Sequence, residues 1–195
     1  PELLETAQSE NIQVIAVVGS ACSTSTGSFD NLVNIADFCE ANDLWFHVDG
    51  AHGGAAIFSN KYRHLLKGIE RADSIIMDFH KMLLTPALTT GVFYKNAQQS
   101  YQTFAQKAHY LWSNSESEEW YNPGKRTYEC TKIMMSLRLY SSLKMHGFEL
   151  WESYVERAFD LGKQFANFIR NKPKFELAIE PSCNIVCFRY LTKGD

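Results

Sequence analysis

The sequence of 195 residues lacks the features that mark several large classes of protein. No block of lysine and arginine stands out and the formal net charge is −3, so charge gives no argument for nucleic-acid binding. The longest apolar runs, such as Val14–Val18, are far too short to span a bilayer, and the first residues show no signal-peptide pattern. With 45% hydrophobic and 21% charged residues, the composition predicts a soluble, globular, cytoplasmic protein with neither nucleic acid nor membrane as a partner.

The sequence also lacks a Cys-x-x-Cys pair, although it contains five cysteines. They are Cys22, Cys39, Cys130, Cys183 and Cys187. Cys183 and Cys187 lie four residues apart in a stretch that resembles a strand, so we expect them to share one face. An odd number of cysteines without Cys-x-x-Cys spacing favours buried, reduced thiols over a disulfide framework or a zinc site.

The length allows one ordinary domain with room for the start of a second. Residues 1–10 resemble the end of a helix that leads directly into a strand, and Asn184–Tyr190 resembles a strand whose sheet is absent. We therefore expect a piece of a larger protein. Residues 1–146 would belong to a large domain, and residues 147–195 would form a connecting helix and the start of a small C-terminal domain.

Alternating strand and helix patterns in the first half predict an α/β fold with a mainly parallel sheet. Strands are expected at 12–18, 44–48, 74–78 and 91–94, the first as an aliphatic run covered on both faces. Asp30 is expected to cap the helix between the first two strands. The apolar residues Leu32, Val33, Ile35, Ala36 and Cys39 have helical spacing there. A short helical segment is expected at 62–66.

The second half of the sequence predicts a long loop, two helices and strands of a layer separate from the main sheet. Residues 113–123 are expected to form an exposed, mobile loop. A helix is expected from about Thr127 to Met145, broken by Gly147 and followed by a second helix to about Ile169. The first of these helices should bury Cys130, Ile133, Met134, Leu137 and Tyr140. Strands at 175–179 and 185–190 would begin an α+β subdomain.

An amine and a carboxylate each follow an apolar strand, and this pair is the main indication of function. Lys81 follows the strand 74–78 in Asp78-Phe79-His80-Lys81, and Asp49 ends the strand 44–48. In an open parallel sheet both would point into the crevice beyond the strand ends, where ligands bind. A lysine there can attack a carbonyl carbon, and an aspartate can keep a pyridine nitrogen protonated. These are the groups that pyridoxal phosphate requires, although a surface lysine and a turn-forming aspartate would leave the same local pattern.

A metal site is the other chemistry to weigh in this region. His47, Asp49 and His52 lie within one short stretch, and His47 and Asp49 share a strand face. No further glutamate or histidine ligand is evident, so we expect no metal. His52 can instead stack on a flat ring or satisfy a loop carbonyl.

Four ordered segments resemble the group II pyridoxal-phosphate-dependent amino acid decarboxylases. This family includes glutamate, aromatic amino acid and 2,4-diaminobutyrate decarboxylases. Cys22–Asp30 resembles the family's Gly-Thr-Thr…Gly-x-Phe-Asp loop, and His47–Gly54 resembles its His-Val-Asp-Ala-Ala-aromatic-Gly-Gly segment. His64–Ser74 resembles the stretch that runs to the family's Asn-Pro-His-Lys, and the similarity continues to Cys187-Phe188-Arg189. The resemblance covers almost the whole chain.

The resemblance implies a fold-type I large domain, pyridoxal 5′-phosphate as cofactor, an amino acid substrate and a homodimer. Lys81 would form the Schiff base and Asp49 would pair with the pyridine nitrogen. Ala51 would pack under the ring, and Thr24 would hydrogen-bond near the cofactor. The catalytic pair would be Lys81 and Tyr121, whose segment matches the family's mobile loop.

The remaining cofactor contacts implied by the resemblance are His80, His52 and Asp78. His80 would help to hold the phosphate. Asp78 replaces the family's common asparagine, and a carboxylate near a phosphate is unfavourable unless it faces away or accepts a hydrogen bond from His80. His52 replaces the usual aromatic residue, and Thr131-Lys132 stands where Gly-Arg is common.

No glycine-rich phosphate cradle is found in this sequence, and the family's ring-stacking histidine and Ser/Ala loop lie upstream of it. We therefore expect the 195 residues alone to be inactive. The main hypothesis is a decarboxylase acting through Lys81. The alternatives are another fold-type I enzyme, such as a lyase, desulfurase or aminotransferase, and a non-catalytic fragment.

Overall fold

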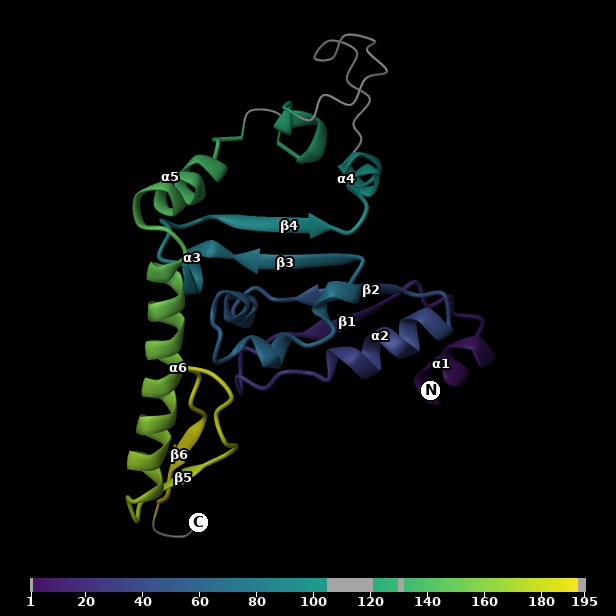
Figure 1. Ribbon diagram of the computed structural model, residues 1–195. Coiled ribbons are helices and arrows are strands. Elements are labelled where there is room, and N and C mark those ends of the chain that lie inside the picture. Colours follow the sequence, from purple (N-terminus) through teal and green to yellow (C-terminus); the bar gives the residue numbers. More distant parts are fainter. Residues whose placement is uncertain (1, 105–120, 130–131, 193–195) are drawn as a thin grey trace.

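The computed structural model describes residues 2–104, 121–129 and 132–192 (Figure 1). The α-helices are α1 (Glu2–Ser9), α2 (Leu32–Ala41), α3 (Phe79–Met82), α4 (Ala97–Phe104), α5 (Ser136–His146) and α6 (Glu149–Arg170). The strands are β1 (Ala16–Ser20), β2 (Trp45–Asp49), β3 (Ser74–Asp78), β4 (Thr90–Tyr94), β5 (Phe175–Leu177) and β6 (Phe188–Tyr190). Four 3₁₀ turns complete the elements: η1 (Gly53–Phe58), η2 (Arg63–Leu66), η3 (Ile69–Arg71) and η4 (Pro123–Arg126).

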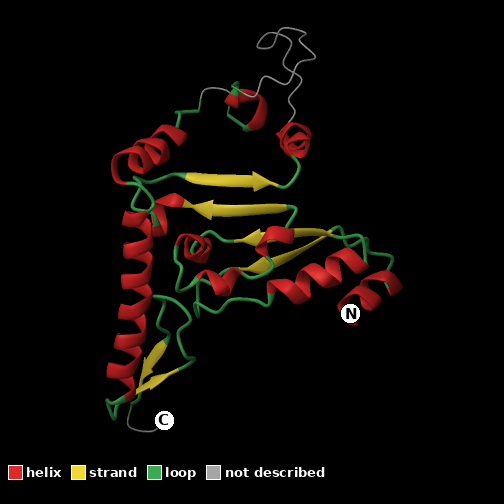
Figure 2. Cartoon of the chain, viewed as in Figure 1, coloured by secondary structure: helices red, strands yellow, loops and turns green. Residues whose placement is uncertain are grey.

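The main sheet has the strand order β1-β2-β3-β4 (Figure 2). β1, β2 and β3 are parallel, and β4 runs antiparallel to β3. The predicted α/β class with a mainly parallel sheet is therefore confirmed, and β1-α2-β2 is the expected strand–helix–strand unit. Because β4 returns along β3, its first residue, Thr90, lies opposite Asp78.

One face of this sheet packs into the core. On β2, Phe46 and Val48 are buried, whereas Trp45, His47 and Asp49 alternate toward the other side. α2 packs against β1 and β2, and η1 packs against β3. The prediction of a first strand at 12–18 covered on both faces is wrong. The strand begins at Ala16, and Val18 remains 59% exposed because the described helices that contact β1 and β2 cover only one face.

The N-terminus of α2 is capped by Asn31 rather than by the predicted Asp30. The Asn31 side chain accepts a hydrogen bond from the backbone N–H of Asn34. The Asp30 carboxylate instead accepts one from the backbone N–H of Ser20 at the end of β1. Asp30 therefore ties the loop after β1 to the strand, and the helix begins one residue later than a cap at Asp30 requires.

α5 is shorter and more exposed than the predicted helix at 127–145. It begins at Ser136 and ends at His146, and Gly147 follows with φ of +69°, a conformation that glycine tolerates. The predicted core residues of this helix are exposed: Ile133, Met134, Leu137 and Tyr140. Their spacing is helical, but no described element packs over them. Cys130, Thr131 and most of the predicted loop at 113–123 lie outside the described residues.

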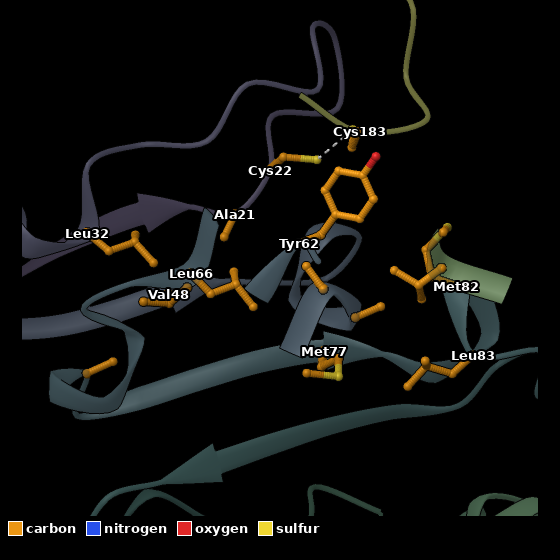
Figure 3. Packing of buried hydrophobic residues seen from close by; sticks show 14 of the residues in the cluster. Ala21, Cys22, Leu32, Val48, Tyr62, Leu66, Met77, Met82, Leu83 and Cys183 are labelled. Atoms are coloured by element: carbon orange, nitrogen blue, oxygen red, sulfur yellow. Dashed lines mark hydrogen bonds between the residues drawn. The ribbon is translucent and has the colours of Figure 1, made fainter. Parts of the chain in front are cut away.

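α6 joins the main core to the C-terminal strands. Trp151, Val155 and Phe159 on α6 belong to the same buried cluster as the sheet residues, which Figure 3 shows in part. After α6, β5 and β6 pair antiparallel as a separate two-stranded sheet beside the C-terminal part of the helix (Figure 1). Cys183 lies in the irregular segment between them, so the prediction that Cys183 and Cys187 share a strand face is wrong. No helix among the described residues is long and apolar enough to cross a membrane.

Candidate active site

The C-terminal ends of β1, β2 and β3 lie at the same edge of the sheet, and backbone hydrogen bonds hold the turns beyond them together. Ser20 pairs with Asp49, and Asp49 pairs with Ile76. Ala21 N–H donates to the Asp49 carbonyl at 2.7 Å, and Asp78 N–H donates to the Ala51 carbonyl at 3.1 Å. The two segments predicted to carry chemistry therefore meet at one edge, as expected for a parallel sheet.

Lys81 projects from α3, one turn beyond the end of β3, and pairs with Asp78. Its Nζ lies 2.9 Å from Asp78 Oδ2, and the Lys81 side chain is 38% exposed against 14% for Asp78. The second carboxylate oxygen, Oδ1, accepts a hydrogen bond from Thr90 Oγ1 at 2.6 Å. The antiparallel return of β4 supplies this hydroxyl, because Thr90 is the register partner of Asp78.

The surroundings of Asp78 shift its pKa below the ordinary value for an aspartate. Burial is the largest influence and acts in the opposite direction, raising the pKa. The hydrogen bond from Thr90 and the hydrogen bond and charge of Lys81 outweigh it, and His80 adds to the lowering. Asp78 is therefore a partly buried carboxylate whose charged form is favoured.

His80 is held by the backbone of Thr89 on the loop before β4. Its Nδ1 lies 3.0 Å from the Thr89 carbonyl oxygen and 3.1 Å from the Thr89 nitrogen, so the tautomer decides which contact is the hydrogen bond. Its Nε2 lies 3.9 Å from Asp78 Oδ2. The ring is thereby oriented beside the Asp78–Lys81 pair.

Asp49 presents an exposed carboxylate at the same edge. Its Oδ1 accepts a hydrogen bond from the backbone N–H of Ala51 at 3.1 Å, which orients the side chain at the turn. His47, on the same face of β2, bonds to Ser74 Oγ at 2.7 Å. The part of the chain that the structure describes contains no group of three or more side chains able to hold a metal ion.

The loop after β1 carries Thr24 in a tight turn. Gly27 N–H donates to the Ser23 carbonyl at 2.8 Å, and Ser23 N–H donates to the Ser28 carbonyl at 2.9 Å. Gly27 has φ of +70°, which favours glycine at this position. The turn leaves Thr24 exposed at its tip.

His52 is joined to the C-terminal segment. Its Nε2 lies 2.8 Å from Asn184 Oδ1, which is a hydrogen bond between groups 132 residues apart. Neither of the two expectations for His52, a stacked ring or a loop carbonyl, anticipated this contact. The residues after α6 therefore reach the turn that follows β2.

The structure places Tyr121 away from this edge. It lies two residues before η4, which packs against α4. α4 follows β4, so it lies beyond the end of the sheet opposite Asp78. The Tyr121 side chain is 68% exposed.

Sequence reasoning missed three residues at the site: Thr89, Thr90 and Asn184. Thr89 and Thr90 were not expected because the strand at 91–94 gave no sign that it runs antiparallel to β3. An amine, two carboxylates and an imidazole thus lie along the edge formed by the ends of β2 and β3. This set suits a cofactor that carries a carbonyl carbon for the amine and a basic ring nitrogen for a carboxylate.

Comparison with known proteins gives a consistent match. The chain matches the family model described as the pyridoxal-dependent decarboxylase conserved domain over residues 2–191. It is 33% identical over 185 residues to the aspartate 1-decarboxylase of Aliivibrio fischeri, covering 95% of this chain and 33% of that protein. It is 32% identical over 188 residues to the L-2,4-diaminobutyrate decarboxylase of Acinetobacter baumannii, covering 96% of this chain and 37% of that protein.

Solved structures agree with the sequence matches. Mouse CSAD in its apo form superposes with a TM-score of 0.87 at 29% identity, covering 97% of this chain and 40% of that chain. The glutamate decarboxylase domain of a Vibrio parahaemolyticus protein superposes with a TM-score of 0.78, also at 29% identity, covering 100% of this chain and 37% of that chain. The chain spans about a third of the length of the curated relatives it matches.

Proposed function

Because the chain belongs to the pyridoxal-dependent decarboxylase family, we propose that the full-length protein removes the α-carboxylate of an L-amino acid as carbon dioxide. The observation that carries the proposal is the position of Lys81. Its amine lies one helical turn beyond the end of β3, beside Asp78 and at the sheet edge that Asp49 shares. In a fold of parallel strands, ligands bind beyond the carboxyl ends of the strands. A lysine at this edge can therefore act as a nucleophile toward a bound ligand.

Pyridoxal 5′-phosphate is the cofactor of this family, and the residues at the edge fit it. Lys81 supplies the amine for its aldehyde, and the exposed carboxylate of Asp49 is suited to the ring nitrogen. When bound, the cofactor withdraws electrons from the substrate's α-carbon and so stabilises the charge that remains as carbon dioxide departs.

Asp78 serves the site through Lys81 rather than as a phosphate ligand. Its Oδ1 accepts from Thr90 and its Oδ2 faces Lys81, so both oxygens are engaged. A phosphate would also be repelled by a carboxylate whose charged form is favoured. When its Nδ1 accepts from the Thr89 N–H, His80 is the neighbouring group able to donate to a phosphate from Nε2.

Thr24, Ala51, His52 and Tyr121 complete the proposed site. Ala51 and Thr24 lie in the turns at the same edge, where Ala51 would pack under the ring and Thr24 would hydrogen-bond near the cofactor. His52 joins the C-terminal segment to this edge through its hydrogen bond with Asn184. Tyr121 would act as the mobile-loop residue. This role requires its segment to move from its position near α4 toward Lys81.

The assembly and cellular setting are also part of the proposal. We propose a cytoplasmic homodimer, in which residues 1–146 belong to the cofactor-binding large domain and residues 147–195 begin the small domain. The substrate is an amino acid, and the relatives named for aspartate and 2,4-diaminobutyrate define the first compounds to test.

The test uses the full-length protein with added pyridoxal phosphate. We expect an absorbance band at about 420 nm and carbon dioxide release from at least one L-amino acid, both lost in Lys81→Ala. Lys67→Ala, which removes another exposed lysine, is the matched control and should keep both. A band that survives in Lys81→Ala would show that the cofactor is attached elsewhere.

The same experiment separates the alternatives. A Lys81-dependent band with keto acid rather than carbon dioxide as product would identify an aminotransferase of this fold. A full-length protein that gives neither band nor product would favour a non-catalytic role.

A further inference from the structure

Two buried thiols from distant parts of the chain lie in contact. Cys22 follows β1 and Cys183 follows β5, and their Sγ atoms are 3.7 Å apart although 161 residues separate them (Figure 3). Cys183 is fully buried and Cys22 is 6% exposed. The other described cysteines are the buried Cys39 and the half-buried Cys187.

The surroundings make the two thiols chemically unequal. The hydrogen bond with Cys183, followed by burial, raises the pKa of Cys22. The hydrogen bond from Cys22 lowers the pKa of Cys183, and this outweighs the opposing effect of burial, with further lowering from the backbone N–H groups of Ile185 and Asn184. The Ile185 nitrogen lies 3.4 Å from Cys183 Sγ. In its neutral form the Cys183 thiol can instead donate to the Gly27 carbonyl at 3.5 Å.

We propose that Cys22 and Cys183 form a reversible oxidation site that closes to a disulfide when the protein meets a hydroperoxide. The Cys183 thiolate attacks one peroxide oxygen, giving a sulfenic acid and hydroxide. The Cys22 thiol, losing its proton to that hydroxide, then attacks the Cys183 sulfur and displaces the second oxygen as hydroxide, which is protonated to water. In total two thiols and one hydrogen peroxide give one disulfide and two waters.

Access and geometry both favour a small oxidant. Cys183 lies in the segment between β5 and β6, which has no regular helix or strand, so local opening of this segment exposes the pair without disrupting the main sheet. The sulfurs then need to approach from 3.7 Å to about 2.05 Å. Hydrogen peroxide is little larger than water and can enter through such an opening.

The disulfide would join two segments of the candidate site. Cys22 lies two residues before Thr24, and Cys183 precedes Asn184, whose side chain bonds to His52. Oxidation would lock the loop after β1 to the C-terminal segment. The inference does not depend on the proposed decarboxylation, because it rests on the two sulfurs alone.

The experiment oxidises the reduced full-length protein with hydrogen peroxide, blocks free thiols with an alkylating reagent in denaturant, and maps peptides by mass spectrometry. We expect a peptide pair linked through Cys22 and Cys183, lighter by two hydrogen atoms than the sum of its reduced parts, and its loss on treatment with dithiothreitol. Cys22→Ser and Cys183→Ser should each abolish the linked pair. Cys39→Ser, which removes another buried thiol, should leave it unchanged.

The unmodified protein decides the outcome even if a variant fails to fold. The half-buried Cys187 serves as an internal measure of the oxidant dose. If Cys187 is oxidised while Cys22 and Cys183 are both recovered fully alkylated, the proposal is overturned. A link from either residue to a different cysteine would overturn it equally.

Discussion

At the scale of single residues, Asp78 shows how a local pattern acquires a chemical role. A strand-ending aspartate is usually a turn former, but here its carboxylate bridges Thr90 on β4 and Lys81 on α3. Both partners donate, and the charged form is favoured despite burial. The ion pair holds the Lys81 amine in place before any ligand binds. This reduces the conformational entropy that the Lys81 side chain would otherwise lose on binding.

Asp78 should also make stability depend on pH in the acid range. Because its pKa is lowered on folding, its contribution is fully present above the unfolded pKa of about 3.9 and is lost as pH falls through the lower folded value. We expect Asp78→Asn to lower the free energy of unfolding near pH 7 by about 1 kcal/mol. The difference from the unmodified protein should shrink as the pH falls below about 4.

Urea unfolding at a series of pH values measures this effect. Thr90→Val removes one donor and should move the acid loss of stability to higher pH, whereas Thr90→Ser keeps the hydroxyl and should not. A difference between Asp78→Asn and the unmodified protein that is constant from pH 7 to pH 3 would contradict the assigned role.

At the scale of elements, α6 holds the turns after β2 through a row of carboxylates. Glu152, Glu156 and Asp160 recur every four residues and therefore share one face of the helix. They accept hydrogen bonds from residues 59–62: Asn60 donates to Glu152, Ser59 donates to Glu156, and Lys61 and Tyr62 donate to Asp160. The helix thus fixes the segment between η1 and η2 while Trp151, Val155 and Phe159 enter the core.

Glu156→Ala should be the most informative change in this row. The Ser59 hydroxyl belongs to a fully buried residue and donates to Glu156 Oε1 at 2.8 Å, and the Lys61 backbone N–H also donates to it. The Lys61 N–H keeps Ser59 Oγ as an acceptor at 3.1 Å, but the buried Ser59 hydroxyl loses Glu156, which should lower the free energy of unfolding by about 1–3 kcal/mol. Chemical denaturation measures the change.

Arg157→Ala is the matched control, because it removes the next, exposed side chain of the same helix. It should change the free energy of unfolding by no more than about 0.5 kcal/mol. Equal effects of the two substitutions would mean that the loss reflects the helix itself rather than its hydrogen bonds to residues 59–62.

At the scale of the whole molecule, the described residues leave large apolar side chains uncovered. Val18 on β1, Val92 on β4, and Leu137 and Tyr140 on α5 are all more than a third exposed. Such surfaces in soluble proteins mark sites of contact with other parts of a protein or with partners. The curated relatives, about three times as long, contain further chain that this segment does not represent.

The 195 residues alone should therefore release no carbon dioxide from the amino acid that the full-length protein is proposed to decarboxylate. Asp49 is exposed and Lys81 is 38% exposed, so water would reach the reacting groups that a closed site excludes. The isolated chain should also bind a hydrophobic dye more strongly than the full-length protein does. Measurable decarboxylation by the 195 residues would refute this prediction.

The sequence by itself determined what depends on local pattern, and only the tertiary structure decided what depends on contact between distant residues. The strand at 74–78, the break at Gly147 and the placement of Asp49 and Lys81 at one sheet edge follow from apolar runs, a turn residue and the geometry of parallel strands. The partners were beyond local pattern. Thr90 reaches Asp78 because β4 turns back antiparallel. Cys22 meets Cys183 because the segment between β5 and β6 packs against α6 at Gly162 and reaches the loop after β1. Helical spacing also predicted a buried α5, but burial requires a second surface, and no described element supplies one over Leu137 and Tyr140.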